Sequence, residues 1–292
     1  MNQIGCGNVL IGSVTLANPV MTASGTAGYG TELADSFDLS ALGALVVKSL
    51  AAFEWAGNPA PRLRPTPAGM LNAVGLQGPG VPYWLANVLP GMLRTGATVV
   101  ASIWGRSVDE YRAAAELLAA APDGVVAVEV NLSCPNLHGT GIIAHDAALS
   151  ADVIAAVAPV AGRPCWAKLS ANTDRIVDVA RAVHTAGAEA VTCINTLLGL
   201  AYDQHTRQPA LGAGGGGLSG PAIHPVAVRA VHDVRAALPD LPIIGVGGIT
   251  DGWSAQEFFL AGASAVQVGT ATFNDPRAPI KILEGLRRVR AT

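Results

Sequence analysis

Residues 165–195 read CWAKLSANTDRIVDVARAVHTAGAEAVTCIN, and this stretch decides the fold. Its ends, residues 165–168 and 190–195, are short and almost wholly apolar, as expected of strands that are buried on both faces. Residues 174–186 between them have a helical pattern and stop at Gly187, a residue type that commonly ends a helix. The stretch therefore predicts a strand, a helix and a second strand parallel to the first.

The same pattern recurs along the chain. Further apolar runs lie at residues 20–24, 44–48, 98–102, 126–131, 243–247 and 265–269. Helical patterns lie at residues 108–120, which follow the plausible N-cap Ser107, and at 225–238, 253–261 and 279–290. Eight strands that alternate with helices predict a closed (β/α)8 TIM barrel. An open doubly wound sheet is the alternative, but nothing after the first strand resembles its GxGxxG turn.

Two segments interrupt the alternation. Residues 50–95 are rich in proline and glycine, with a helical pattern only at 81–93, and residues 197–222 include four consecutive glycines at 214–217. Long insertions in a compact barrel usually form lids or binding loops, and we expect them at the C-terminal face. Because no linker or repeat divides the chain, we predict one barrel domain over residues 1–292.

The composition excludes several classes of function. A net charge of −3 and an aromatic content of 5% argue against nucleic-acid binding. The four cysteines, Cys6, Cys134, Cys165 and Cys193, form no CxxC pair, so we expect no metal site, no iron–sulfur cluster in this chain and no disulfide framework. No apolar run approaches the roughly 20 residues of a membrane span, and the start lacks a signal peptide. We expect a soluble cytoplasmic protein without a membrane partner.

The predicted strand ends indicate where the site lies, because TIM barrels build their sites at the C-terminal ends of the strands. These ends are Ser24, Lys48, Ser102, Asn131, Lys168, Asn195, Gly247 and Gly269. A single strand-end lysine is commonly a charge that reaches solvent, but two lysines with two asparagines favour a site for an anionic ligand. The glycine turns at 245–248, 269–270 and 218–220 would present backbone N–H groups to a phosphate.

Cys134 is the most reactive candidate. It follows the strand at 126–131 directly, on a polar loop that contains Pro135, so it would lie over the barrel mouth. A thiol there can act as a nucleophile or a general base, since nearby cations lower its pKa. Cys165 and Cys193 lie inside apolar strands, where burial as small hydrophobic side chains is expected.

These residues match the pattern of a known family. The ordered motifs are NPVMTASG at 18–25, VKS at 47–49, NAVGL at 72–76, NLSCPN at 131–136, KLS at 168–170, INT at 194–196, GGLSGPA at 216–222, GVGGI at 245–249 and AGASAVQVGT at 261–270. Over nearly its whole length the chain resembles the class 1 dihydroorotate dehydrogenases, most closely the 1B type.

The resemblance implies a flavoprotein oxidoreductase that binds FMN and oxidises dihydroorotate to orotate in de novo pyrimidine biosynthesis. Cys134 would be the general base, and Lys168 would stabilise negative charge on the reduced flavin. Lys48 would meet both the flavin and the substrate carboxylate. The cofactor residues would be Ser24, Lys48, Ser49, Ser102, Asn131, Lys168, Ile194, Gly220, Gly247, Gly248, Gly269 and Thr270. The substrate residues would be Lys48, Asn72, Ala73, Val74, Gly75, Leu76, Asn131, Asn195 and Thr196.

The chain departs from the family pattern at Ser102 and Gly78, where the family usually has asparagine, and at residues 137–141. These changes leave open a dehydrogenase of another dihydropyrimidine, such as dihydrouracil. The residues also admit a Schiff-base aldolase that uses Lys168 or Lys48, which would leave Cys134 without a role. A third alternative is a flavin- or nucleotide-binding protein that has lost its chemistry.

The electron acceptor is also open. The 1B resemblance implies a homodimer core that binds a second subunit, which carries FAD and a 2Fe–2S cluster and passes electrons to NAD. The 1A relatives instead use fumarate as homodimers. Since this chain has neither a cysteine array nor a dinucleotide fingerprint, we expect it to need such a partner subunit if NAD is the acceptor.

Overall fold

The computed structural model describes residues 7–133 and 142–291, so Cys6 and Cys134 lie outside the described residues. Its centre is a sheet of eight parallel strands in the order β3-β14-β13-β10-β9-β8-β7-β4. Their bounds are β3 Val20–Thr22, β4 Leu45–Val46, β7 Val99–Ile103, β8 Val125–Asn131, β9 Cys165–Lys168, β10 Ala190–Cys193, β13 Ile243–Val246 and β14 Ala265–Val268. All eight predicted strands are thereby confirmed, with shifts of no more than two residues at their ends.

The two edges of this sheet meet. A parallel bridge pairs Met21 in β3 with Ala44, which directly precedes β4, and the Val46 N–H donates to Thr22 Oγ1 at 2.9 Å. The antiparallel hairpin of β1 (Val9–Ile11) and β2 (Val14–Leu16) packs its buried side chains against the barrel residues Met21 and Trp166. The predicted TIM barrel is therefore confirmed, with its lower interior filled by apolar side chains.

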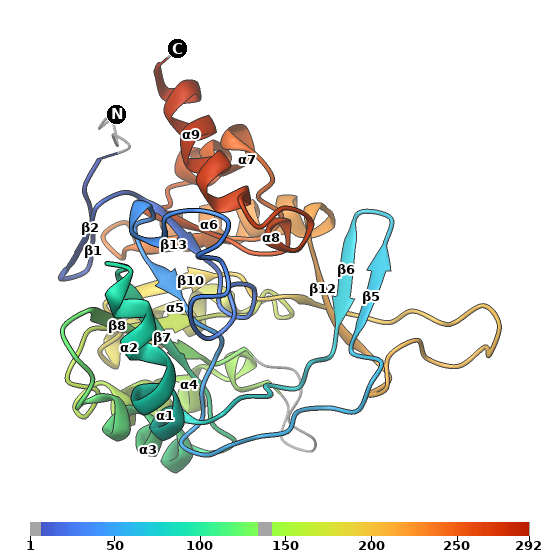
Figure 1. Ribbon diagram of the computed structural model, residues 1–292, viewed down its shortest axis with the longest axis horizontal. Coiled ribbons are helices and arrows are strands. Elements are labelled where there is room, and N and C mark those ends of the chain that lie inside the picture. The colour runs from blue at the N-terminus through green and yellow to red at the C-terminus, as the bar shows by residue number, and fades with distance from the viewer. Residues whose placement is uncertain (1–6, 134–141, 292) are drawn as a thin grey trace.

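Helices surround the sheet (Figure 1). The long ones are α3 Val108–Leu118, α4 Ala147–Val157, α5 Ile176–Thr185, α6 His224–Ala237, α7 Gly252–Leu260 and α9 Ala278–Ala291, and the short turns are η1 Leu39–Ala41, η3 Ile143–His145, η4 Pro221–Ile223 and α8 Ala271–Asn274. Ser107 caps α3 as predicted, since its side chain accepts from the Glu110 N–H. The apolar side chains of these helices and the outer faces of the strands form one core.

Two helices differ from the expectation. The helix predicted at 81–93 is wrong as a continuous α-helix: it consists of α1 Val81–Tyr83, a π-helical turn η2 Trp84–Val88 and α2 Leu89–Arg94. Pro90 lacks the N–H that a regular helix would use there, which explains the irregular turn before it. Helix α4 was not predicted, because its small and apolar residues give no clear polar face.

The two insertions form a second sheet instead of irregular loops. Its four antiparallel strands have the order β11-β12-β6-β5, with β5 Leu63–Thr66, β6 Gly69–Asn72, β11 Leu197–Gly199 and β12 Gly216–Ser219. β12 of one insertion pairs with β6 of the other, and the sheet stands beside the barrel with the 200–215 loop extending outward (Figure 1). Residues from both insertions line the cavity described below.

Within the described ranges, no helix combines the length and the apolar character that a membrane crossing requires.

Candidate active site at the carboxyl ends of the barrel strands

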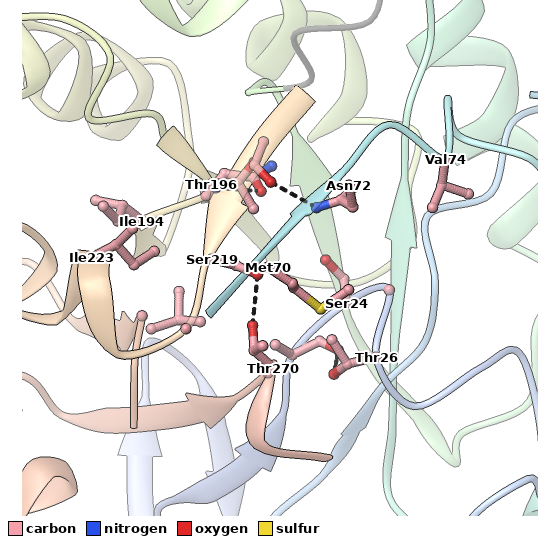
Figure 2. Close-up of a pocket in the computed structure, with 18 of the residues that line it drawn as sticks. Ser24, Thr26, Met70, Asn72, Val74, Ile194, Thr196, Ser219, Ile223 and Thr270 are labelled. Carbon is pink, nitrogen blue, oxygen red and sulfur yellow. Dashed lines mark hydrogen bonds between the residues drawn. The ribbon is translucent and has the colours of Figure 1, made fainter. Parts of the chain in front are cut away.

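A cavity opens where the barrel strands end and the antiparallel sheet begins. It encloses about 1080 Å³ of empty space, part of which is open to solvent. Lys48, Asn131 and Lys168 line it from the barrel, while Asn72 and Ser219 line it from the second sheet. Figure 2 shows Ser219 of β12 and Thr270 beyond β14 pointing toward each other, with Thr270 Oγ1 donating to Ser219 Oγ at 2.7 Å.

Lys168 brings a positive charge to the cavity floor. Lys168 is only 3% exposed, and its Nζ donates to Ser24 Oγ at 3.0 Å. Below it, Glu129 Oε1 lies 3.8 Å from the same Nζ. Lys48, the second lysine, lines the same cavity two residues beyond β4. Two ammonium groups in one cavity create a positive potential that suits an anionic ligand.

Asparagine amides form a connected network on one wall. Asn195 Nδ2 donates to Ser133 Oγ at 2.8 Å and to Asn131 Oδ1 at 3.3 Å, and Asn131 Nδ2 donates to Ser49 Oγ at 3.1 Å. Asn72 Nδ2 donates to the Gly217 carbonyl oxygen at 3.2 Å. Each amide has both donor and acceptor atoms, so this wall can pair with a ligand that carries ring amide groups.

A glycine turn shapes the other end of the cavity. Gly247 and Gly248 follow β13 with φ values of 140° and 66°, a region that side-chain-bearing residues rarely adopt. A Cβ on Gly248 would lie 2.8 Å from the Gly220 carbonyl oxygen and 2.7 Å from His224 Cβ. His224 Nδ1 lies 2.9 Å from the Gly247 carbonyl oxygen and supports the turn from behind. The backbone is therefore held close to the cavity, as a phosphate cradle requires.

Most of the predicted site residues lie around this one cavity. The members of the predicted cofactor and substrate sets that line it are Ser24, Lys48, Ser49, Asn72, Val74, Gly75, Leu76, Asn131, Lys168, Ile194, Asn195, Thr196, Gly220, Gly247, Gly248, Gly269 and Thr270. Cys134 lies outside the described residues, but the chain reaches Ser133 beside the asparagine network. The assignment of individual contacts to cofactor or substrate remains a prediction.

Two predicted residues lie behind the cavity wall. Ser102 is fully buried and its hydroxyl is 2.9 Å from Ser49 Oγ, because β7 continues to Ile103 and Ser102 is not its last residue. Ala73 is fully buried and packs with Leu71 and Leu211, because it follows β6 on the face turned away from Asn72. Their positions support an indirect role, in which each fixes a neighbour that lines the cavity.

Several cavity residues were not predicted. Leu63, Met70 and Ser219 belong to the second sheet, and Phe273 lies in α8 after the last strand. Glu129 was also missed, although an acidic residue two positions before Asn131 in an apolar strand was a visible indication, since residues two apart share one face.

The two described cysteines are chemically inert. Burial raises the pKa of the Cys193 thiol to about 12, and burial together with nearby Glu189 raises that of Cys165 to about 12. Both stay protonated near neutral pH, so the expectation that they are small hydrophobic core residues is supported. The described residues hold no group of three or more His, Cys, Asp or Glu side chains that could bind a metal.

Cationic, amide-lined and glycine-rich walls at the strand ends of a TIM barrel are typical of an enzyme site for an anionic ligand. The family described as dihydroorotate dehydrogenase matches residues 8–289. The chain belongs to the dihydroorotate dehydrogenase family of oxidoreductases, which confirms the predicted family and enzyme class. Membership of this family implies a flavin cofactor and dihydroorotate oxidation in pyrimidine biosynthesis.

Similar proteins carry names of both types. The chain is 46% identical to "Dihydroorotate dehydrogenase B (NAD(+)), catalytic subunit" of Trichlorobacter lovleyi, over 96% of this chain and 92% of that protein. It is 48% identical to the protein of the same name from Desulforudis audaxviator, over 96% and 91%. It is 47% identical to "Dihydroorotate dehydrogenase A (fumarate)" of Lactiplantibacillus plantarum, over 95% and 92%. The predicted resemblance to the B type is confirmed, and the A type is similar to the same degree.

Proposed function

We propose that this chain oxidises (S)-dihydroorotate to orotate with FMN as its flavin. The observation that carries the proposal is the joint lining of one cavity by Lys48, Lys168 and the three asparagines Asn72, Asn131 and Asn195. The substrate carries a carboxylate and a ring with amide groups. A lysine ammonium suits the former, and asparagine side chains suit the latter.

The chemistry of the cavity lining supports FMN as the flavin. Its single phosphate matches the glycine turn at Gly247 and Gly248, where a Cβ would clash with side chains of α6 and force the turn to shift. Gly269 and Thr270 border the same end of the cavity. The flavin ring would then be bordered by Ser24, Ser49 and Ile194. When bound, FMN supplies the acceptor for the hydride that leaves the substrate ring.

The protein's own residues would hold the substrate and move the proton. Lys48 would bind the carboxylate, and the asparagines with Thr196 would fix the ring against rotation. We propose that the Cys134 thiolate removes the proton from the ring carbon next to the one that loses hydride. The two C–H bonds on neighbouring ring carbons break, one hydrogen leaving as a proton and the other as a hydride, which balances the oxidation to orotate. A lysine charge near this thiol would favour its thiolate form.

We propose a homodimer of this chain that works with a second subunit carrying FAD and a 2Fe–2S cluster. The type B names of several relatives, which include the words "catalytic subunit", support this assembly. Fumarate as direct acceptor is the competing arrangement, supported by the type A relatives. Anaerobic reoxidation of the reduced purified chain by fumarate would favour the second arrangement, and failure to react with fumarate would favour the first.

The substrate is tested by comparing dihydroorotate with dihydrouracil, which lacks the carboxylate, in the wild type and in Lys48→Ala. We expect the variant to lose at least tenfold more kcat/KM for dihydroorotate than for dihydrouracil, since a charge-assisted hydrogen bond contributes roughly 1.5–3 kcal/mol. Product is measured chromatographically with a dye as acceptor. Equal losses for the two substrates would mean that Lys48 serves the flavin only, and a wild type that prefers dihydrouracil would overturn the assignment of the substrate.

A further inference from the structure

A polar layer lies inside the barrel, between the apolar lower interior and the cavity. It consists of Glu129 on β8, Thr192 on β10 and Gln267 on β14, each of them fully buried. Side chains two residues apart on a strand share a face. Ala127 belongs to the apolar interior and Asn131 lines the cavity, so Glu129 between them points into the barrel.

The carboxylate of Glu129 is held asymmetrically. Its Oε2 accepts hydrogen bonds from Thr192 Oγ1 at 3.0 Å and from Gln267 Nε2 at 2.6 Å. Its Oε1 accepts no hydrogen bond from the residues that the structure describes, and Lys168 Nζ lies 3.8 Å from it. Two neighbours therefore fix one oxygen while the other faces the ammonium group.

Lys168 is held between two groups. Its side chain is 4% exposed, and its Nζ donates to Ser24 Oγ at 3.0 Å on the cavity wall. A buried charge without a partner is strongly unfavourable, and an isolated buried carboxylate is equally so. Each group thus makes the burial of the other possible, and the pair lies directly under the proposed cofactor site.

We propose that Glu129 is a positioning residue that fixes Lys168 against the cavity floor and, through its negative charge, limits how strongly Lys168 stabilises charge on the bound cofactor. This inference rests on the proposed function, because it concerns the lysine assigned to the reduced flavin. Glu129 does not line the cavity, so we assign it no contact with the substrate.

The first test is the flavin midpoint potential of the FMN-loaded protein. Glu129→Gln keeps the shape of the side chain but removes the charge, which leaves Lys168 uncompensated. Coulomb's law with an effective dielectric constant of about 20 gives an effect on the order of tenfold for a unit charge about 10 Å away. We expect the equilibrium to shift about tenfold toward the reduced flavin, or about 30 mV upward for two electrons.

The matched control is Thr192→Val, which removes a hydrogen bond to the same carboxylate and keeps both charges. It should change the flavin equilibrium less than twofold. A Glu129→Gln protein whose potential equals that of the wild type, or of Thr192→Val, would overturn the proposal. Bleaching of the wild-type flavin by dihydroorotate tests the proposed function separately, so the two failures are distinguishable.

The second test needs no cofactor. In the apoprotein, Glu129→Gln should lower the folding equilibrium constant, and the double variant Glu129→Gln with Lys168→Gln should recover at least tenfold of that loss. The double variant also decides the case in which Glu129→Gln does not fold, because it should fold where the single variant fails. A double variant that is as unstable as the sum of both single changes, or that fails to fold, would contradict the pairing.

Discussion

Replacement of Gly248 by alanine should lower both the stability of the fold and the affinity for FMN, and the two losses can be measured independently. Gly248 has φ 66°, and an L-residue in this left-handed conformation costs roughly 1–2 kcal/mol. The new Cβ would also lie 2.8 Å from the Gly220 carbonyl oxygen and 2.7 Å from His224 Cβ, so the turn must shift. Overpacking of this kind costs roughly 1–3 kcal/mol, which gives a total loss of about 2–5 kcal/mol in unfolding free energy.

The same shift of the turn should weaken the binding of FMN. Displacing one backbone donor from a phosphate removes a hydrogen bond to a charged group, about 1.5–3 kcal/mol, so the Kd for FMN should rise roughly 10- to 150-fold. Urea unfolding of the apoprotein measures the first quantity, and quenching of flavin fluorescence on titration measures the second.

Gly214→Ala is the matched control for this change. Gly214 has φ 85°, but its Cβ would meet no atom within 4 Å, and it lies in the loop between β11 and β12. This variant should lose only the roughly 1–2 kcal/mol of backbone strain and keep the wild-type Kd for FMN. A folded Gly248→Ala protein that binds FMN as tightly as Gly214→Ala would refute the phosphate cradle.

Three other predictions concern the base, the buried thiols and a helix cap. Cys134→Ala should retain FMN but slow its anaerobic reduction by dihydroorotate roughly 10²–10⁴-fold in stopped flow, and near-normal reduction would remove Cys134 from the mechanism. Burial raises the pKa of Cys165 and Cys193 to about 12, whereas an unfolded cysteine titrates near about 8.5. The free energy of unfolding should therefore be unaffected by these thiols below about pH 8.5. As the pH rises from there toward 12, it should fall by up to about 1.4 kcal/mol per pH unit for each thiol. Urea unfolding of Cys193→Ala should show a shallower alkaline decline, and an unchanged slope would contradict this. Asp251→Ala removes the acceptor of the Ser254 N–H at 2.8 Å and should lower the unfolding free energy by about 1 kcal/mol, whereas an unchanged urea midpoint would show that the cap of α7 is dispensable.

The barrel was predictable because buried parallel strands leave a strong pattern. Runs such as residues 165–168 and 243–247 are short, apolar and separated by amphipathic segments, so their number and spacing indicate the closed sheet. The site followed from the same pattern, since the C-terminal strand ends must meet on one face. The strand pattern therefore predicts that Lys48 and Lys168 share one cavity.

The second sheet was not predictable from the same pattern. Its strands have three or four residues, β5 contains Pro65, and β12 begins with two glycines. Such strands form because the neighbouring chain segments pair with them, and their composition argues against strand formation when it is read locally.

Whether a side chain lines the cavity or lies behind its wall was harder to predict than which strand carries it. A shift of one residue in the end of a strand turns a side chain to the other face or to another depth. The sequence pattern predicts Ser102 at a strand end, but β7 runs one residue further, and the Ser102 hydroxyl meets Ser49 instead of the cavity. Glu129 is the opposite case. Its spacing of two residues from Asn131 indicates that both side chains share one face of the strand, but the apolar residues around it make a buried structural position the more obvious interpretation.

The most direct test of the central claim is an absorbance spectrum of the purified protein, repeated without oxygen after dihydroorotate is added. We predict the spectrum of a bound flavin that bleaches on addition of dihydroorotate, with orotate formed in equal amount. A flavin spectrum that dihydroorotate leaves unchanged would contradict the account and would direct attention to another dihydropyrimidine and to the altered positions Gly78 and Ser102.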